Sequence, residues 1–305
     1  MSLYSAHGKL LLTGEYLVLD GAKALAIPTR FGQQMQVAWH RSGPKLRWAA
    51  EDHQGKTWLS TALYSLDDST DKLMDAPEEK RLLQIFRAAR KQKPNVWDTH
   101  LSGRSIHTTL DFDRGWGLGT SSTLISLLSQ YLEIDPYQLL EDTFGGSGYD
   151  LACATTNRPL TYLLKEGLPQ VGYINWQPSW LEDTYFVYLG QKQNSRAGIR
   201  RYREKGASTV EIELASHLTD RLIEAPSLSE AQIIVKEHEA LISRIIELPT
   251  VQSQHFADFQ GMTKSLGAWG GDFIWVLPNN SEAPVYFSNR GYHTIFRYHQ
   301  MALKS

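Results

Sequence analysis

The sequence predicts a protein that combines antiparallel strands with long helices, and two regions carry this prediction. The first hundred residues contain apolar and polar residues in alternation at 35–39, and strand-like runs at 45–50 and 56–63. Two long helices are expected later, near 208–224 and 229–247, and the second keeps an apolar stripe at helical spacing. A chain of 305 residues is long enough for two domains or for one large one.

Further elements are expected along the rest of the chain. Residues 77–91 form an amphipathic helix with Pro77 in its first turn, and a strand covers 101–110. Asp135 is the expected N-cap of another helix, with Pro136 at its first position. Asp20-Gly21 is a typical hairpin dipeptide. Later strands are expected at 161–164, 171–176, 185–189, 273–277, 285–287 and 292–297.

Composition and charge exclude several classes of protein. The hydrophobic content of 42% and the charged content of 21% are ordinary for a globular chain. A net charge of −2 indicates neither a nucleic-acid partner nor an anionic membrane. The only cysteine, Cys153, excludes an internal disulfide, and no Cys/His cluster indicates zinc. Without a signal peptide or an apolar run of about 18 residues, we expect a cytoplasmic protein.

A glycine-rich segment at residues 114–123, Arg-Gly-Trp-Gly-Leu-Gly-Thr-Ser-Ser-Thr, precedes an apolar run with helical spacing. Glycine lets the backbone turn tightly and bring N–H groups close to a ligand. Thr120, Ser121 or Ser122 can cap the helix, whose start is partly positive, so the segment suits a phosphate. It matches neither the Walker A motif nor the dinucleotide fingerprint. The alternative is a glycine turn before a capped helix.

Two more glycine-bearing segments lie near the ends of the chain, and a short glycine-rich turn follows the expected Asp135 helix. Near the N-terminus, residues 8–16 read Gly-Lys-Leu-Leu-Leu-Thr-Gly-Glu-Tyr. Near the C-terminus, residues 267–272 read Gly-Ala-Trp-Gly-Gly-Asp. Residues 145–150, Gly-Gly-Ser-Gly-Tyr-Asp, end on Asp150, which alone could be a helix N-cap.

The order of these segments resembles that of the GHMP small-molecule kinases. The first segment resembles their first motif, Gly117-Leu118-Gly119-Thr120-Ser121 resembles their Gly-Leu-Gly-Ser-Ser, and residues 267–271 resemble their Gly-Ala-Gly-Gly-Gly. Glu15-Tyr16, residues 147–150 and the Gly271-Asp272 ending look most like phosphomevalonate kinase, whereas mevalonate kinase and galactokinase carry Glu-His in place of Glu15-Tyr16. The resemblance extends over nearly the full length.

The resemblance implies a two-domain α+β fold. Residues 1–170 would form an ATP-binding domain like ribosomal protein S5 domain 2, and residues 171–305 a ferredoxin-like domain. It also implies transfer of the γ-phosphoryl group of ATP to an alcohol or phosphate monoester, with phosphomevalonate or mevalonate as first choice. The partner is then a small molecule, and a homodimer is left open.

The resemblance also assigns roles to residues, with ATP and Mg²⁺ as cofactors. Asp150 would orient or deprotonate the acceptor, and Lys9 would neutralise charge on it. Ser121 would hold Mg²⁺ with a carboxylate, for which we select Glu141. The expected ATP-binding residues are Gly115, Gly117, Leu118, Gly119, Thr120, Ser121 and Ser122. The expected substrate-binding residues are Glu15, Tyr16, Ser147, Lys192, Ser195, Arg196, Lys264, Gly267 and Gly270; for the cations Lys192, Arg196 and Lys264, ordinary exposed basic residues are the alternative.

Two other functions stay open. A lyase like diphosphomevalonate decarboxylase is related in fold and also consumes ATP. A degenerate member of the family that binds without turnover is suggested by Trp116 in the phosphate loop and by Trp269 in place of the middle glycine of the third motif. The presence of Lys9, Ser121 and Asp150 argues against such a binding protein.

Overall fold

The computed structural model describes residues 1–40, 43, 45–67, 74–191, 195–267, 269 and 271–303, without the side chains of Ser195 and Arg196. The chain divides into two compact units. The first unit consists of Met1–Gly8, Phe31–Arg114 and Gly119–Thr155, and the second of Lys9–Arg30, Gly115–Leu118 and Thr156–Ser305. This division differs from a single boundary after residue 170, because two strands and the glycine loop each contribute residues to both units.

The first unit contains the strands and helices that the sequence places in the first half of the chain. Its strands are β1 (Ser2–Leu11), β2 (Ala24–Trp39), β3 (Leu46–Glu51), β4 (Thr57–Leu63) and β5 (Arg104–Leu110), of which β1 and β2 also contribute residues to the second unit. Its helices are α1 (Pro77–Gln92), α2 (Thr120–Leu132), α3 (Pro136–Glu141) and α4 (Tyr149–Ala154), with a single π-helical turn at Trp97–Leu101.

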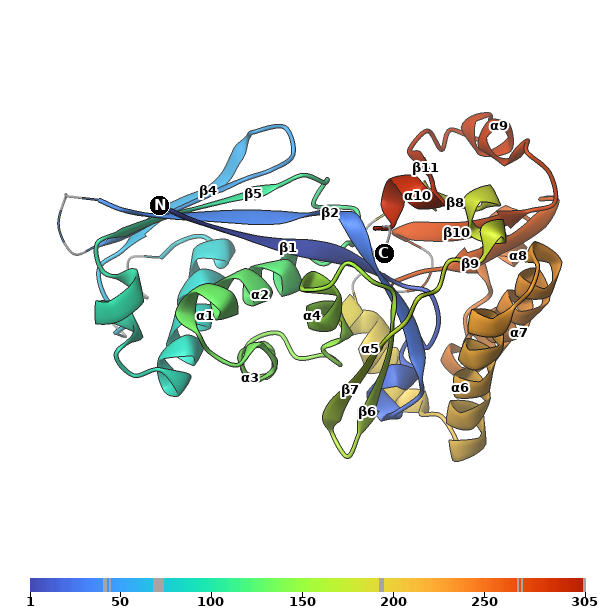
Figure 1. Cartoon of the computed structure of the whole chain (residues 1–305), viewed down its shortest axis with the longest axis horizontal. Helices are drawn as coiled ribbons and strands as arrows, with labels where there is room; N and C mark the ends of the chain where they lie inside the picture. The colour runs from blue at the N-terminus through green and yellow to red at the C-terminus, as the bar shows by residue number, and fades with distance from the viewer. Residues whose placement is uncertain are drawn as a thin grey trace. The chain divides into compact units, whose positions relative to one another are not determined.

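The strands of the first unit form a sheet in the order β4-β3-β5-β2, with β1 paired to β2. β3 pairs with β5 in parallel, whereas β3–β4 and β2–β5 are antiparallel. Along β5 buried and half-buried residues alternate, as a strand covered on one face requires. Figure 1 shows helices α1 to α4 together on one face of these strands.

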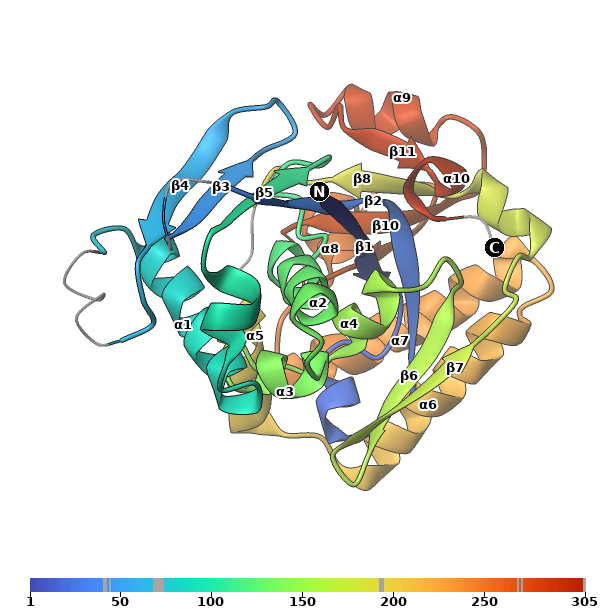
Figure 2. The same ribbon diagram turned by 60° about the vertical axis from the view of Figure 1, so that its left-hand side comes forward.

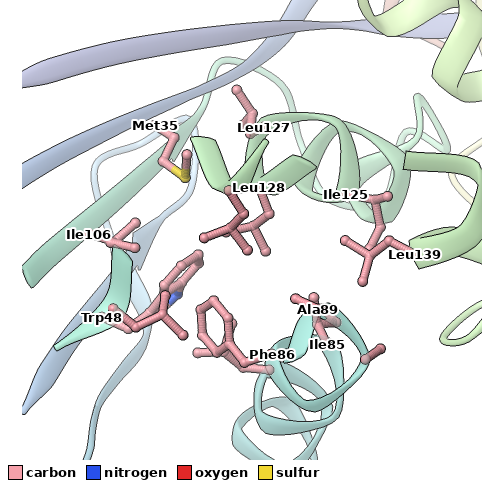
Figure 3. Close-up of a cluster of buried hydrophobic side chains, with 14 of the residues drawn as sticks. Met35, Trp48, Ile85, Phe86, Ala89, Ile106, Ile125, Leu127, Leu128 and Leu139 are labelled. Atoms are coloured by element: carbon pink, nitrogen blue, oxygen red, sulfur yellow. The ribbon is translucent and has the colours of Figure 1, made fainter. Parts of the chain in front are cut away.

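The core of the first unit lies between this sheet and its helices. Trp48 of β3 packs edge-on against Phe86 of α1, with ring centroids 5.9 Å apart. Figure 3 shows Met35 and Ile106 from the strands on one side of the cluster, and Leu127 and Leu128 of α2 facing them. All these side chains are buried, so α2, which follows the glycine loop, is held firmly by packing.

The second unit contains the remaining elements. Its strands are β6 (Leu160–Lys165), β7 (Leu168–Tyr173), β8 (Tyr185–Tyr188), β9 (Gly261–Ser265), β10 (Phe273–Pro278) and β11 (Ile295–Arg297). Its helices are α5 (Ser195–Lys205), α6 (Thr209–Glu224), α7 (Leu228–Ile246), α8 (Val251–His255), α9 (Ala283–Ser288) and α10 (Tyr298–Met301). Two 3-10 turns, η1 (Leu17–Asp20) and η4 (Ser179–Asp183), complete it.

A four-stranded antiparallel sheet organises the second unit, in the order β11-β8-β10-β9. Along the chain the elements run β8, helices, β9, β10, helix, β11, which is the connection of a ferredoxin-like fold. The α+β fold class and its ferredoxin-like part are therefore confirmed. Helices α6 and α7 lie side by side in this unit, as Figure 2 also shows. A β6–β7 hairpin pairs with the start of β2 at Ala24 to Ala26.

Local signals in the sequence explain where several helices begin. The Asp135 carboxylate accepts from the N–H groups of Tyr137 and Gln138 and caps α3 as predicted. Ser208 caps α6, where the Glu211 side chain also accepts from the Ser208 N–H in a reciprocal capping box. These bonds satisfy donors that a helix start would otherwise leave without partners.

Two predicted elements are wrong. Residues 285–287 lie in helix α9 and not in a strand, because Pro284 occupies the first turn and Phe287 packs into the core beneath. Asp20-Gly21 does not form a hairpin turn. Asp20 instead ends the 3-10 turn η1, and Gly21 follows it in the left-handed conformation, with φ 89°.

Candidate active site

The first glycine segment, residues 8–16, meets the second, residues 114–123, at Gly117 and Leu118 in the second unit. The N–H of Lys9 donates to the carbonyl of Leu118 at 3.0 Å, and the Lys9 ammonium donates to the carbonyl of Gly117 at 3.0 Å. Lys9 lies near the end of β1 and is half-buried. Both its backbone and its side chain therefore hold the glycine loop, so the Lys9 charge lies at the loop that the sequence assigns to phosphate.

The third glycine segment, residues 267–272, contacts the same loop through Asp272. A Cβ added at Gly117 would lie 2.3 Å from Oδ2 of Asp272, and one added at Gly267 would lie 3.0 Å from the same oxygen. Both glycines have positive φ, 68° at Gly117 and 63° at Gly267. Glycine is therefore required at Gly117 for two independent reasons, the backbone conformation and the contact with Asp272.

We expect Gly117→Ala to lower the free energy of unfolding by about 2–4 kcal/mol, because a side chain at this φ is strained and would displace Asp272. Chemical denaturation measures the change. Gly167→Ala is the matched control, since Gly167 also has positive φ, 76°, but faces open space. Its cost should stay near 1–2 kcal/mol. Equal losses in the two variants would show that the Asp272 contact contributes nothing.

Trp116 packs the glycine loop against aromatic side chains of the second unit. Its ring contacts Tyr188, Phe273 and Phe296, with centroid distances of 6.4, 5.7 and 5.2 Å. The Tyr188 hydroxyl donates to the carbonyl of Gly115 at 3.2 Å. Aromatic pairs of this kind stabilise beyond the area that they bury. The tryptophan that the sequence places in the loop is therefore an anchor on strands β8, β10 and β11.

Helix α2 begins directly after the loop, but not with the predicted hydroxyl cap. Gly119, with φ 96°, is the N-cap residue, and no described side chain caps the helix start. The Ser122 hydroxyl donates instead to the carbonyl of Gly119 at 2.9 Å, while Ser121 is exposed. Thr120, Ser121 and Ser122 occupy the first turn, where backbone N–H groups point out of the helix. Such a start suits an anion.

Asp150 lies in the first unit, at the second position of α4. Gly148 has φ 86° and precedes this helix, and Ser147 beside it is buried. Helix α4 contacts α2, so Asp150 and the predicted ATP-binding hydroxyls belong to neighbouring helices of one unit. The Asp150 side chain is half-buried.

The predicted metal ligands stay a prediction. Glu141 is exposed at the last residue of α3, and Ser121 is exposed in the first turn of α2. Within the described part of the chain, no three His, Cys, Asp or Glu side chains gather to hold a metal ion.

Lys264, predicted to bind substrate or to be an exposed basic residue, lies in a buried cluster. Its side chain is fully buried, and its ammonium donates to Glu15, to Oε1 of Glu239 at 3.3 Å and to the carbonyl of Ser265 at 3.2 Å. An ammonium has three donors, and here three acceptors take them. Lys264 therefore ties the first segment to strand β9 and helix α7. Glu15, also predicted to contact substrate, is buried in the same cluster.

The other members of this buried cluster have shifted pKa values. The N–H of Gly14 donates to Nε2 of His238 at 3.0 Å, and burial holds the pKa of His238 well below its usual range. Burial also raises the pKa of Glu15. The pKa of Glu239 is raised from 4.5 to about 7, chiefly by burial, although Lys264 opposes the shift. The cluster thus has one cation and two carboxyl groups, of which Glu239 takes a proton near neutral pH.

We expect this cluster to make the protein less stable as pH rises from 4.5 to about 7. Because the folded state holds the Glu239 proton more tightly than the unfolded state, ionisation favours unfolding in this range, by up to about 3 kcal/mol. Urea denaturation at pH 5 and pH 8 measures the difference. Glu239→Gln should flatten it, whereas Glu213→Gln at an exposed position should leave it unchanged. An unaltered slope in Glu239→Gln would contradict the assignment.

Tyr16 joins the first segment to helix α5. Its ring stacks on Tyr202, with centroids 5.9 Å apart and planes inclined by 20°. A Cβ added at Gly198 would lie 2.5 Å from the Tyr16 hydroxyl, so glycine lets α5 approach this ring closely. The Tyr202 hydroxyl in turn donates to Asp20. The predicted substrate residue Tyr16 is therefore buried against α5, and burial raises its pKa.

Several of the remaining residues predicted to bind substrate lie wholly or partly outside the described residues. Ser195 and Arg196 form the start of α5, but their side chains lie outside the described residues. Lys192 and Gly270 also lie outside the described residues. Asp272 is the residue that sequence reasoning missed. In the sequence, Asp272 stands out as an acid directly after a glycine pair. Its approach to Gly117 in the structure shows that it belongs to the glycine loop.

The fold of this chain is that of solved kinases named for small-molecule substrates. Phosphomevalonate kinase of Streptococcus pneumoniae, solved with phosphomevalonate and AMPPNP, is 16% identical, and the match covers 97% of this chain and 100% of that one, with a TM-score of 0.70. Mevalonate kinase of Methanococcus jannaschii is 13% identical, covers 97% and 96%, and has a TM-score of 0.69. Galactokinase of Lactococcus lactis, solved with galactose, is 10% identical, covers 99% and 93%, and has a TM-score of 0.66.

These matches confirm the resemblance to GHMP kinases at the level of the fold. No protein-family model and no curated protein sequence gives a significant match to this chain. Among the helices that the structure describes, none combines the length and the apolar character needed to cross a membrane.

Proposed function

We propose that this chain is an ATP-dependent kinase of the GHMP family that phosphorylates an alcohol or a phosphate monoester. The observation that carries the proposal is the meeting of all three glycine segments, where Lys9 and Asp272 both contact Gly117. A glycine loop with an ammonium group at its carbonyl and a helix directly after it is suited to bind phosphates. The fold supports the same class of protein.

The glycine loop and the start of helix α2 fit a nucleoside triphosphate. Helix α2 has 13 residues, and no side chain within the described ranges caps its start, so backbone donors of its first turn are available to phosphate oxygens. ATP, when bound, supplies the γ-phosphoryl group and Mg²⁺ neutralises its charge. Residues 115–122 would bind the phosphates, and Ser121 with Glu141 would hold the Mg²⁺.

Asp150 and Lys9 have the charges that the acceptor requires. In the proposed reaction Asp150 accepts a hydrogen bond from the acceptor hydroxyl and orients it or takes its proton. The Lys9 ammonium neutralises the negative charge that develops on the acceptor oxygen. Phosphoryl transfer depends mainly on positioning and on electrostatic stabilisation, and these two groups supply both at the acceptor oxygen.

Phosphomevalonate and mevalonate are the proposed acceptors. The solved structures with this fold include mevalonate kinases and a phosphomevalonate kinase that holds phosphomevalonate and AMPPNP. Neighbours of the same fold also include kinases of galactose and of a heptose phosphate, so the fold alone does not select the acceptor.

A turnover screen with ATP and Mg²⁺ tests the proposal. The acceptors are mevalonate, phosphomevalonate, homoserine, galactose and a heptose phosphate, and ADP release is followed for each. We expect ADP release with phosphomevalonate or mevalonate. Release of CO₂ from a diphosphorylated acid would show the lyase instead, and nucleotide binding without ADP release from any acceptor would show a binding protein.

A further inference from the structure

A pocket of about 480 Å³ lies in the second unit, beside the first and third glycine segments. Tyr16 of the first segment and Trp269 of the third contribute to its wall. Helix α5 contributes Arg200, Arg201 and Lys205, and the end of α7 contributes Ile246. We call this the arginine pocket.

The charges of the arginine pocket favour an anion. Its lining has three cations, Arg200, Arg201 and Lys205, against one acid, Glu204. The Lys205 ammonium is paired with Glu247 at 2.7 Å, so the two arginines carry most of the excess positive charge. The hydrogen bond that the structure describes for Arg201 goes to the Ile246 carbonyl at 3.5 Å and uses one of its five donors. Guanidinium groups are well shaped for phosphate.

Two buried aromatic side chains, Tyr16 and Trp269, also line the pocket. Tyr16 is buried and stacked on Tyr202. Trp269 is buried, its indole N–H donates to the Pro249 carbonyl at 3.3 Å, and its backbone has φ 63°, which is rare for a bulky residue. Residues held in such a conformation are often found at ligand sites. A ligand that fits this pocket has a short hydrocarbon part against the rings and an anionic end at the arginines.

Two residues that line the arginine pocket, Tyr16 and Trp269, come from the segments that also contact the glycine loop. Trp269 lies between Gly267 and Asp272, and Asp272 contacts Gly117 of the loop. Tyr16 follows Glu15 in the first segment, and both Asp272 and Arg201 lie close enough to act electrostatically on its hydroxyl. Through Asp272, the segment that carries Trp269 is therefore linked to the loop that is proposed to bind phosphates.

We propose that the arginine pocket binds the phosphate of a phosphorylated acceptor, and that Arg200 and Arg201 select this acceptor over its unphosphorylated form. The inference rests on the proposed function and names its substrate class as a phosphate monoester. Tyr16 and Trp269 contact the hydrocarbon part of the acceptor, while the two guanidinium groups bind the phosphate oxygens.

The experiment compares Arg200→Gln, Arg201→Gln and the double variant with Arg203→Gln. Arg203 is a matched control, because it is an exposed arginine of the same helix that does not line the pocket. We expect the double variant to raise KM for phosphomevalonate about 10- to 100-fold and to leave KM for ATP and mevalonate unchanged. Arg203→Gln should change all three less than about twofold. Circular dichroism confirms that each variant is folded.

Calorimetric titration of phosphomevalonate without nucleotide separates this inference from the proposed function. If no acceptor is turned over but the double variant loses phosphomevalonate binding, the pocket is supported and the kinase proposal fails. If turnover occurs and the double variant behaves like Arg203→Gln, the pocket inference is overturned and the kinase stands. An equal rise in KM for mevalonate and phosphomevalonate would overturn the selection of the phosphate.

Discussion

Lys264→Met is expected to lower the free energy of unfolding by about 3–5 kcal/mol at pH 7.5. The substitution keeps most of the side-chain volume but removes the one ammonium that contacts Glu15 and Glu239, both of which are about 1% exposed. Two buried carboxyl groups would then lack a cation, and each would have to lose its charge or its burial. Urea denaturation measures the loss.

The pH dependence and a surface control make this prediction specific. At pH 5 the loss should shrink, because protonated carboxyl groups need no cation. Lys91→Met removes an exposed pair, in which the ammonium lies 3.5 Å from Asp142, and should cost less than about 1 kcal/mol. Glu15→Gln and Glu239→Gln added to Lys264→Met should restore part of the stability. A loss below 1 kcal/mol for Lys264→Met would show that the cluster is not a structural ion-pair network.

The sequence predicts elements well where the decisive interactions are local. The helices at α3 and α6 start at Asp135 and at Ser208, since cap and first turn are close along the chain. At residues 285–287 the apolar run predicts a strand. The local signal for a helix is Pro284 in its first turn, and the packing of Phe287 on Phe256 and Phe259 of a distant segment is not visible in the sequence. The helix at α5 was not predicted either, since its first residues form a polar and basic run without an apolar stripe.

The candidate site shows the same limit. The order of the glycine segments indicates Lys9 and Gly117 as parts of one site, and the bond between them is a contact over 108 residues. The spacing of residues in the sequence does not reveal that Lys264 is buried among carboxylates, because Glu15 and Glu239 are separated from it by 249 and 25 residues along the chain. Nor does spacing reveal the arginine pocket, which forms only when α5 packs beside Tyr16.

Asp150→Asn is expected to lower kcat about 10²- to 10⁴-fold while leaving nucleotide affinity nearly unchanged. Asparagine keeps the size of the side chain but cannot accept a proton or carry negative charge. Asp150 lies at the second position of α4, and the predicted phosphate-binding hydroxyls lie on α2. The substitution therefore leaves the residues proposed to bind ATP intact. Steady-state rates with the acceptor found in the screen, together with a nucleotide titration, measure both quantities.

A control variant and the size of the loss distinguish the two roles proposed for Asp150. Asp142→Asn removes a carboxylate of the same unit that pairs with Lys91, and should leave kcat within about twofold. If Asp150 takes the proton, the loss of kcat in Asp150→Asn should lie near the upper end of the range, because asparagine cannot act as a base. If Asp150 only orients the acceptor, the loss should stay near the lower end of the range, because asparagine can still accept a hydrogen bond. Unchanged kcat would remove Asp150 from the reaction, and with it the assignment of α4 to the active site.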